Sequence, residues 1–106
     1  MQPPIVTAAP FASVEAAWFS TAHALRAGAT RRSDVDGVIR CLDRLYRNRR
    51  IEVLHARILR IWGSRGVAPN PARARERSDW QIWREALDRL EGPLRAQGIV
   101  GERLSG

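Results

Sequence analysis

Few side chains in this sequence have the chemistry of a catalytic or metal-binding group. The chain has two histidines, His23 and His55, and one cysteine, Cys41. They are too few for a four-ligand zinc site and fall at no ligand spacing that such sites use. The glycines of GSRG, residues 63–66, lack the strand and the lysine of a phosphate-binding loop.

The surroundings of these groups favour structural roles. His55 lies on the apolar side of a predicted helix, where a core histidine bonded to a backbone carbonyl is commoner than a catalytic base. Cys41 lies inside another predicted helix, and no neighbour in the sequence supplies a base that would activate its thiol. We therefore expect no enzyme, no metal site and no cofactor.

Arginine is the charged residue that dominates the chain. All eighteen basic residues are arginine, and with eleven acidic residues they give a formal net charge of +7. The segment from Arg40 to Arg77 holds eleven arginines and three acidic residues, a net charge of +8, whereas the remainder carries −1. Clustered guanidinium groups with few carboxylates are typical of proteins that bind a negatively charged partner, nucleic acid above all.

The length and composition predict one folded domain. A chain of 106 residues with 44% hydrophobic residues is long enough to bury a core. The proline-rich residues 1–11 are predicted to form a flexible N-terminal arm, and residues 12–106 a single helical domain. No apolar run is long enough to span a membrane. A signal peptide begins with a basic region, and this sequence has no basic residue before Arg26. A single cysteine forms no internal disulfide. These features lead us to expect a cytoplasmic protein without membrane contact.

Apolar residues recur every three or four positions along most of the chain, which predicts an all-α fold of four helices. The first helix is predicted from Ser13 to a C-terminal cap at Gly28. The second is predicted to begin with Ser33 as N-cap and Asp36 in its first turn. Two ion pairs at spacing four, Asp36–Arg40 and Asp43–Arg47, are predicted on its outer face. Three large residues expected on apolar helix faces are Leu25, Tyr46 and Leu54.

The third and fourth helices are predicted on either side of a loop. The third runs over residues 51–64, after a tight corner at residues 48–50, and stops at Gly63 or Gly66. Residues 67–77 are predicted to form an exposed loop. The fourth helix is predicted to start at Ser78, with Gln81 completing a capping box. Gly92–Pro93 should bend or end it, because a proline ring clashes with the carbonyl group four residues earlier.

A resemblance to a known family appears toward the C-terminus. The phrase WREALDRLEGPLRAQGIV, residues 83–100, resembles the end of a winged helix-turn-helix domain, in which the recognition helix closes on L-x-x-L-E and G-I-V enters the first wing strand. HARILRIWGSRG, residues 55–66, resembles the preceding core helix of that family. The resemblance covers residues 50 to 100. It implies a small four-helix domain of helix-turn-helix type with a short C-terminal β wing, active in transcription regulation. A helix bundle that shares only the helix-turn-helix arrangement fits the same residues.

The DNA-binding interpretation gives the polar residues specific roles. The fourth helix would lie in a major groove, where the candidates for reading bases are Gln81, Arg84, Asp88 and Arg89. The candidates for binding phosphate are Arg49, Arg50, Arg57, Arg60, Arg65, Arg73, Arg75 and Arg77. The alternative for Arg84, Asp88 and Arg89 is that they form surface ion pairs at spacing four, together with Glu85.

The sequence thus favours a small basic DNA-binding protein, either a transcription regulator or a DNA-associated accessory factor. The alternative is a helical protein-interaction adaptor that binds no nucleic acid and whose arginines meet an acidic surface. RNA binding is the third choice. A homodimer, which a palindromic DNA site would require, and a protein partner both stay open.

Overall fold

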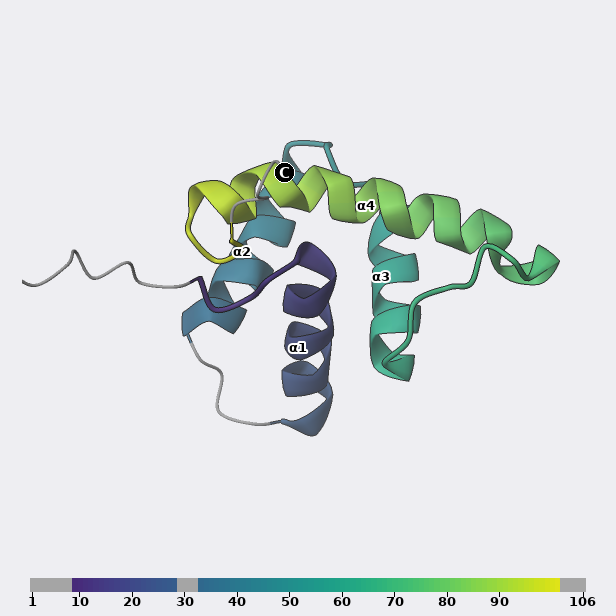
Figure 1. The fold of residues 1–106 in the computed structure, drawn as a ribbon. Helices are drawn as coiled ribbons and strands as arrows, with labels where there is room; N and C mark the ends of the chain where they lie inside the picture. The colour runs from purple at the N-terminus through teal and green to yellow at the C-terminus, as the bar shows by residue number, and fades with distance from the viewer. Residues whose placement is uncertain (1–8, 29–32, 102–106) are drawn as a thin grey trace, which may run out of the picture.

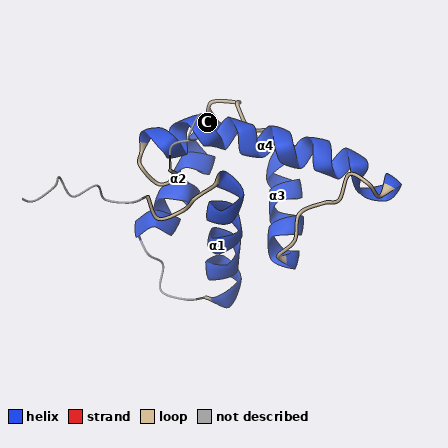
Figure 2. Ribbon diagram, in the orientation of Figure 1, coloured by secondary structure: helices blue, strands red, loops and turns tan. Residues whose placement is uncertain are grey.

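The structure is a computed structural model, and it describes residues 9–28 and 33–101. It contains four α-helices, α1 (Val14–Ala27), α2 (Ser33–Arg47), α3 (Val53–Arg65) and α4 (Arg77–Ala96), and a 3₁₀ turn, η1 (Ala74–Glu76), that precedes α4. Figure 1 shows α4 lying across one end of the other three helices, and α4 packs against each of them. The predicted all-α fold of four helices is confirmed, and Figure 2 shows no strand in the described part of the chain.

Local sequence signals account for several helix ends. The Ser13 hydroxyl oxygen accepts the N–H of Ala16 at 3.1 Å and caps α1. Gly28 ends α1 with φ 64°, and Gly66 ends α3 with φ 73°. Glycine adopts this left-handed conformation without the steric penalty of a Cβ atom. The predictions for both ends of α1 and for Gly66 are therefore confirmed, whereas α2 already includes Ser33, so the prediction that Ser33 is the N-cap is wrong.

The fourth helix starts before the predicted Ser78, and it does not end at Gly92–Pro93. The chain is already helical from η1 onward and has right-handed helical dihedral angles at Glu76, so Ser78 lies inside α4 and forms no capping box with Gln81. At the other end, α4 continues through Pro93 to Ala96. Gly92 removes one obstacle, because a glycine has no Cβ atom to clash with the ring of the following proline. Leu94, which is fully buried, anchors the last turn in the core.

The chain after α4 pairs with the chain before α1 instead of forming a wing. Val100 and Phe11 form an isolated parallel bridge, in which the Phe11 N–H donates to Ile99 O at 3.2 Å and the Gly101 N–H donates to Phe11 O at 3.0 Å. The β wing is thus absent from the described residues. Phe11 packs against the core, which moves the end of the predicted arm toward the N-terminus. Residues 1–8 of that arm lie outside the described residues.

The core lies where α4 crosses the other helices. Its members come from all four helices, and those with no measurable exposure are Ala17, Val38, Leu59, Trp83, Ala86, Leu90 and Leu94. Three predicted apolar-face residues are instead about half exposed, at 49% for Leu25, 47% for Tyr46 and 48% for Leu54. Leu59 and Gly63 occupy the buried face of α3, so the α3 face that packs inward is rotated away from Leu54.

Close packing of α1 on α3 depends on one glycine. A Cβ atom added at Gly63 would lie 2.7 Å from Trp18 Nε1 and 2.9 Å from the Ala22 Cβ. The Trp18 ring has little freedom to retreat, because its Nε1 donates to Leu59 O at 2.7 Å. We expect Gly63→Ala to lower the free energy of unfolding by about 1–3 kcal/mol, even though alanine favours helix. Urea denaturation followed by circular dichroism would measure the loss.

Gly37→Ala is the matched comparison, since Gly37 also lies inside a helix. The added Cβ atom would lie 2.5 Å from the Ile99 Cδ1, the flexible end of a side chain that can rotate away. We therefore expect a smaller loss than at Gly63, offset in part by the gain in helix propensity. Equal stability of the two variants would contradict the α1–α3 contact described above.

Candidate nucleic-acid interface

Three of the four arginines of α4 are paired with carboxylates of the same helix. Arg84 Nη2 lies 3.7 Å from Asp88 Oδ1, Arg89 Nη2 lies 2.5 Å from Glu85 Oε1, and Arg95 pairs with Glu91. The remaining α4 arginine, Arg77, donates to Pro71 O at 3.4 Å. Within Arg77–Ala96 four arginines face four acidic residues, so α4 carries no net charge.

The four base-reading candidates are all exposed on α4, but both arginines among them are engaged. Arg84 is paired with Asp88, and Arg89 is paired with Glu85 and also donates to Arg50 O at 2.8 Å. The ion pairs at spacing four that formed the alternative prediction are therefore present. A shallow depression next to Arg84 and Asp88 also contains Glu15, Glu91 and Arg95, so carboxylates outnumber guanidinium groups there.

The eight phosphate-binding candidates divide into two groups. Three are engaged within the chain: Arg65 lies over the Trp62 ring at 4.7 Å, Arg73 pairs with Glu76 at 3.3 Å, and Arg77 donates to Pro71 O. The other five are exposed, and their side chains make no hydrogen bond or ion pair with any described residue; they are Arg49, Arg50, Arg57, Arg60 and Arg75.

Two arginines of α2 that were not among the phosphate-binding candidates belong with the second group. The predicted Asp43–Arg47 pair is present at 2.7 Å. The predicted partner of Asp36, Arg40, makes no ion pair with a described residue, and neither does Arg44. We call the six unpaired arginines of α2, α3 and the connection between them the arginine surface; it consists of Arg40, Arg44, Arg49, Arg50, Arg57 and Arg60.

Hydrogen bonds fix the backbone conformation of the connection between α2 and α3, which carries part of the arginine surface. The N–H groups of Arg50 and Ile51 both donate to Leu45 O, at 2.8 and 3.2 Å, and Arg49 takes a left-handed conformation with φ 61°. Ile51 is buried, with 1% of its surface exposed, and Arg89 binds the carbonyl oxygen of Arg50 from α4. The tight corner predicted at residues 48–50 is therefore fixed from two sides.

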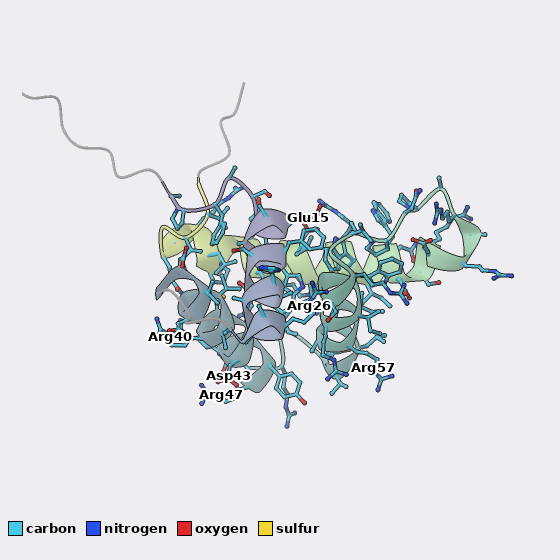
Figure 3. The ribbon with its side chains drawn as sticks, turned by 90° about the horizontal axis from the view of Figure 1, so that it is seen from below. Glu15, Arg26, Arg40, Asp43, Arg47 and Arg57 are labelled. Atoms are coloured by element: carbon cyan, nitrogen blue, oxygen red, sulfur yellow. The ribbon has the colours of Figure 1, made fainter. Side chains whose placement is uncertain are left out.

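Few carboxylates lie along the same stretch of chain. Between Arg40 and Arg65 there are eight arginines and two acidic residues, a net charge of +6, and one of the acids, Asp43, is paired with Arg47. Figure 3 shows Arg40 and Arg47 projecting outward from α2 and Arg57 projecting outward from α3. Positive charge that the chain does not neutralise is therefore concentrated on α2, the corner and α3.

The side chains considered for catalysis have structural surroundings. His55 is 5% exposed; its Nδ1 accepts the Glu52 N–H at 3.1 Å, and its Nε2 lies 3.5 Å from Glu85 Oε2. The backbone partner is thus an N–H group at the start of α3 and not a carbonyl. Cys41 is 2% exposed; burial raises the pKa of its thiol, and nearby Arg44 opposes part of that rise. A thiol held protonated in this way is a poor nucleophile.

Neither metal-ligand geometry in the described residues nor similarity to known proteins assigns a function to the chain. No group of three His, Cys, Asp or Glu side chains in residues 9–28 and 33–101 is placed to hold a metal ion. None of the helices in those ranges has both the length and the apolar character that crossing a bilayer requires. No protein-family model, curated protein or solved structure matches the chain.

Proposed function

We propose that this chain binds nucleic acid, with duplex DNA as the first choice, by contacting backbone phosphates with the arginine surface. The observation that carries the proposal is the contrast between two sets of arginines. Those of α4 are engaged by acids or carbonyl groups of the chain, whereas the six of the arginine surface are exposed and unpaired within the described residues. Guanidinium groups of the second kind can bind phosphate without first breaking an ion pair.

The expected binding mode is electrostatic and has little sequence preference. Contacts to phosphate position a protein on DNA but do not read its bases. Base reading by Arg84 or Arg89 requires their pairs with Asp88 and Glu85 to open, which reduces the gain from each new contact. The geometry therefore favours a DNA-associated accessory factor over a regulator that recognises a target sequence through α4.

The proposal is tested by titrating labelled random duplex DNA of about 20 base pairs with the full chain at several salt concentrations. Each neutralised phosphate contributes about −0.9 to the slope of log affinity against log salt, so five contacts give a slope of about −4.5. The affinity should then fall roughly 500-fold between 50 and 200 mM salt. Fluorescence anisotropy measures both quantities.

Two parallel titrations decide between this proposal and the other classes of partner. Random duplex RNA of the same length should bind no more tightly than the DNA, and tighter binding to RNA would change the assigned nucleic acid. Absence of salt-dependent binding to either duplex at micromolar protein would contradict the proposal and favour a protein-interaction adaptor. Size-exclusion chromatography of the same samples shows whether a dimer forms.

A further inference from the structure

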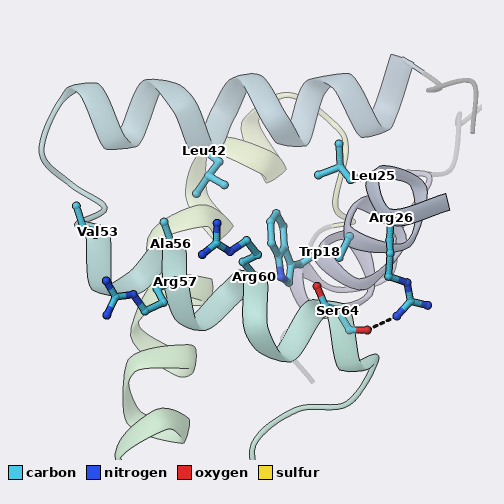
Figure 4. Close-up of a pocket in the computed structure, with 10 residues that line it drawn as sticks. Trp18, Leu25, Arg26, Leu42, Val53, Ala56, Arg57, Arg60 and Ser64 are labelled. Atoms are coloured by element: carbon cyan, nitrogen blue, oxygen red, sulfur yellow. Dashed lines mark hydrogen bonds between the residues drawn. The ribbon is translucent and has the colours of Figure 1, made fainter. Parts of the chain in front are cut away.

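A groove of about 560 Å³ lies among α1, α2 and α3. Its apolar walls consist of Trp18, Ala22, Leu25, Leu42, Val53 and Ala56. Its polar residues are Arg26, Arg57, Arg60 and Ser64. Figure 4 shows these residues converging from the three helices. Among the residues that the structure describes, three guanidinium groups and no carboxylate line the groove, so these residues give it a positive charge.

The apolar part of the groove is preformed and needs no ligand to assemble it. Trp18 is 5% exposed, and its ring is held by the hydrogen bond from Nε1 to Leu59 O at 2.7 Å. At the rim, Leu25 and Val53 are 49% and 57% exposed, and Figure 4 shows them at opposite ends of the groove. An occupant that covered both would remove apolar surface from water, which favours binding.

The cations are placed beside this apolar surface. Arg26 is fixed at one end by its hydrogen bond to Ser64 O. Arg60 lies between Ala56 and Trp18 in Figure 4, and neither the Arg57 nor the Arg60 guanidinium group has a hydrogen bond or ion pair with a described residue. A guanidinium group flanked by apolar walls interacts more strongly with an anion than one surrounded by water.

We propose that the groove binds a small amphipathic anion, a molecule with an apolar body and one carboxylate. The apolar body would lie on Trp18 and Leu42, and the carboxylate would contact Arg60 and, at the rim, Arg57. The volume is within the range of about 300–1,000 Å³ that small-molecule sites occupy. The charge of the groove selects an anion, and its apolar walls select against a small inorganic one.

Binding of such a ligand would also affect nucleic-acid binding, and this part of the inference rests on the proposed function. Arg57 and Arg60 belong to both the groove and the arginine surface. A carboxylate on these two guanidinium groups and a DNA phosphate cannot be bound there together. The amphipathic anion therefore competes with nucleic acid and reduces its affinity for the chain.

Decanoate is the probe for a direct binding test, measured by isothermal titration calorimetry of the full chain without DNA. We expect one saturable site with a dissociation constant below about 1 mM, the usual limit of weak specific binding. Acetate has the negative charge of decanoate without its long alkyl group, and decyltrimethylammonium has the alkyl group without the negative charge. Neither should bind at this site, and equal binding of all three probes would overturn the proposal.

Variants of exposed residues locate the site. Arg60→Gln should weaken decanoate binding at least tenfold, and so should Val53→Glu, which adds a carboxylate at an exposed rim position. Arg75→Gln, which removes an unpaired arginine outside the groove, should leave it unchanged. Equal losses in the Arg60 and Arg75 variants, or many weak sites, would show that decanoate binds only to general positive charge.

The competition is measured separately by adding decanoate to the anisotropy titration. If decanoate binds the chain and DNA does not, the groove assignment stands and the proposed function fails. If DNA binds and decanoate does not, the proposed function stands and the groove assignment fails, leaving a helical segment of an acidic partner protein as the next occupant to examine. If both bind without competition, the shared use of Arg57 and Arg60 is wrong.

Discussion

Replacing Arg49, Arg50, Arg57 and Arg60 together by glutamine is expected to lower the affinity for random duplex DNA by roughly 10³-fold at 0.1 M salt. The slope of log affinity against log salt should become less steep by about 3.6. The reason is that these four guanidinium groups are exposed and unpaired within the described residues, so each is available to a phosphate. Glutamine at position 49 keeps the backbone strain that Arg49 already bears at φ 61°, so no new strain is added.

A second variant with the same loss of charge makes this comparison decisive. Replacing Arg73, Arg75, Arg77 and Arg84 by glutamine also changes the formal net charge from +7 to +3. Three of these residues are engaged within the chain, so we expect a loss of less than about tenfold, from the weaker overall field. A larger loss here than in the first variant would contradict the arginine surface and favour binding through η1 and α4.

Several elements of the fold could be predicted because their causes are local. Ser13 and Gly28 bound α1 through hydrogen bonding and dihedral angles that depend on the residues themselves. The apolar period of the fourth helix selects Trp80, Trp83, Leu87 and Leu90; the last three are buried in the core, and Trp80 is only partly buried. The start of α4 could not be predicted in this way. The capping box at Ser78 is a local preference that requires a residue with extended dihedral angles at the N-cap. The turn η1 leads directly into α4, and Glu76 before the helix has right-handed helical dihedral angles instead.

The site was predictable in composition but not in arrangement. The sequence indicates the excess of arginine between residues 40 and 77, and this excess does not depend on the fold. Which arginines stay unpaired does depend on it. Arg89 reaches the carbonyl oxygen of Arg50, and Arg26 reaches that of Ser64, contacts that join positions 39 and 38 residues apart. The groove combines residues of three helices, and no spacing in the sequence brings Leu25, Leu42 and Val53 together.

The largest effect on stability is expected from Trp83→Ala. Trp83 is fully buried in α4, its ring centroid lies 5.4 Å from that of Phe19, and its Nε1 donates to Glu15 Oε2 at 3.2 Å. Replacing a buried tryptophan by alanine leaves a cavity and costs about 3–5 kcal/mol. Domains of this size have a free energy of unfolding of about 5–15 kcal/mol, so the variant should lose much of its stability. Urea denaturation and near-ultraviolet circular dichroism measure the loss.

Two further substitutions separate packing from other effects of tryptophan. Trp80→Ala removes an only partly buried ring three residues earlier in α4 and should cost less than Trp83→Ala, and equal costs would contradict the packing of α4 on α1.

Trp83→Phe keeps the contact with Phe19 but loses the hydrogen bond to Glu15, so it should cost about 1–2 kcal/mol. Trp83 lies in the core and outside the arginine surface. The folded Trp83→Phe variant should therefore bind duplex DNA with the affinity and salt dependence of the original chain, whereas a change in the salt slope would mean that α4 takes part in binding.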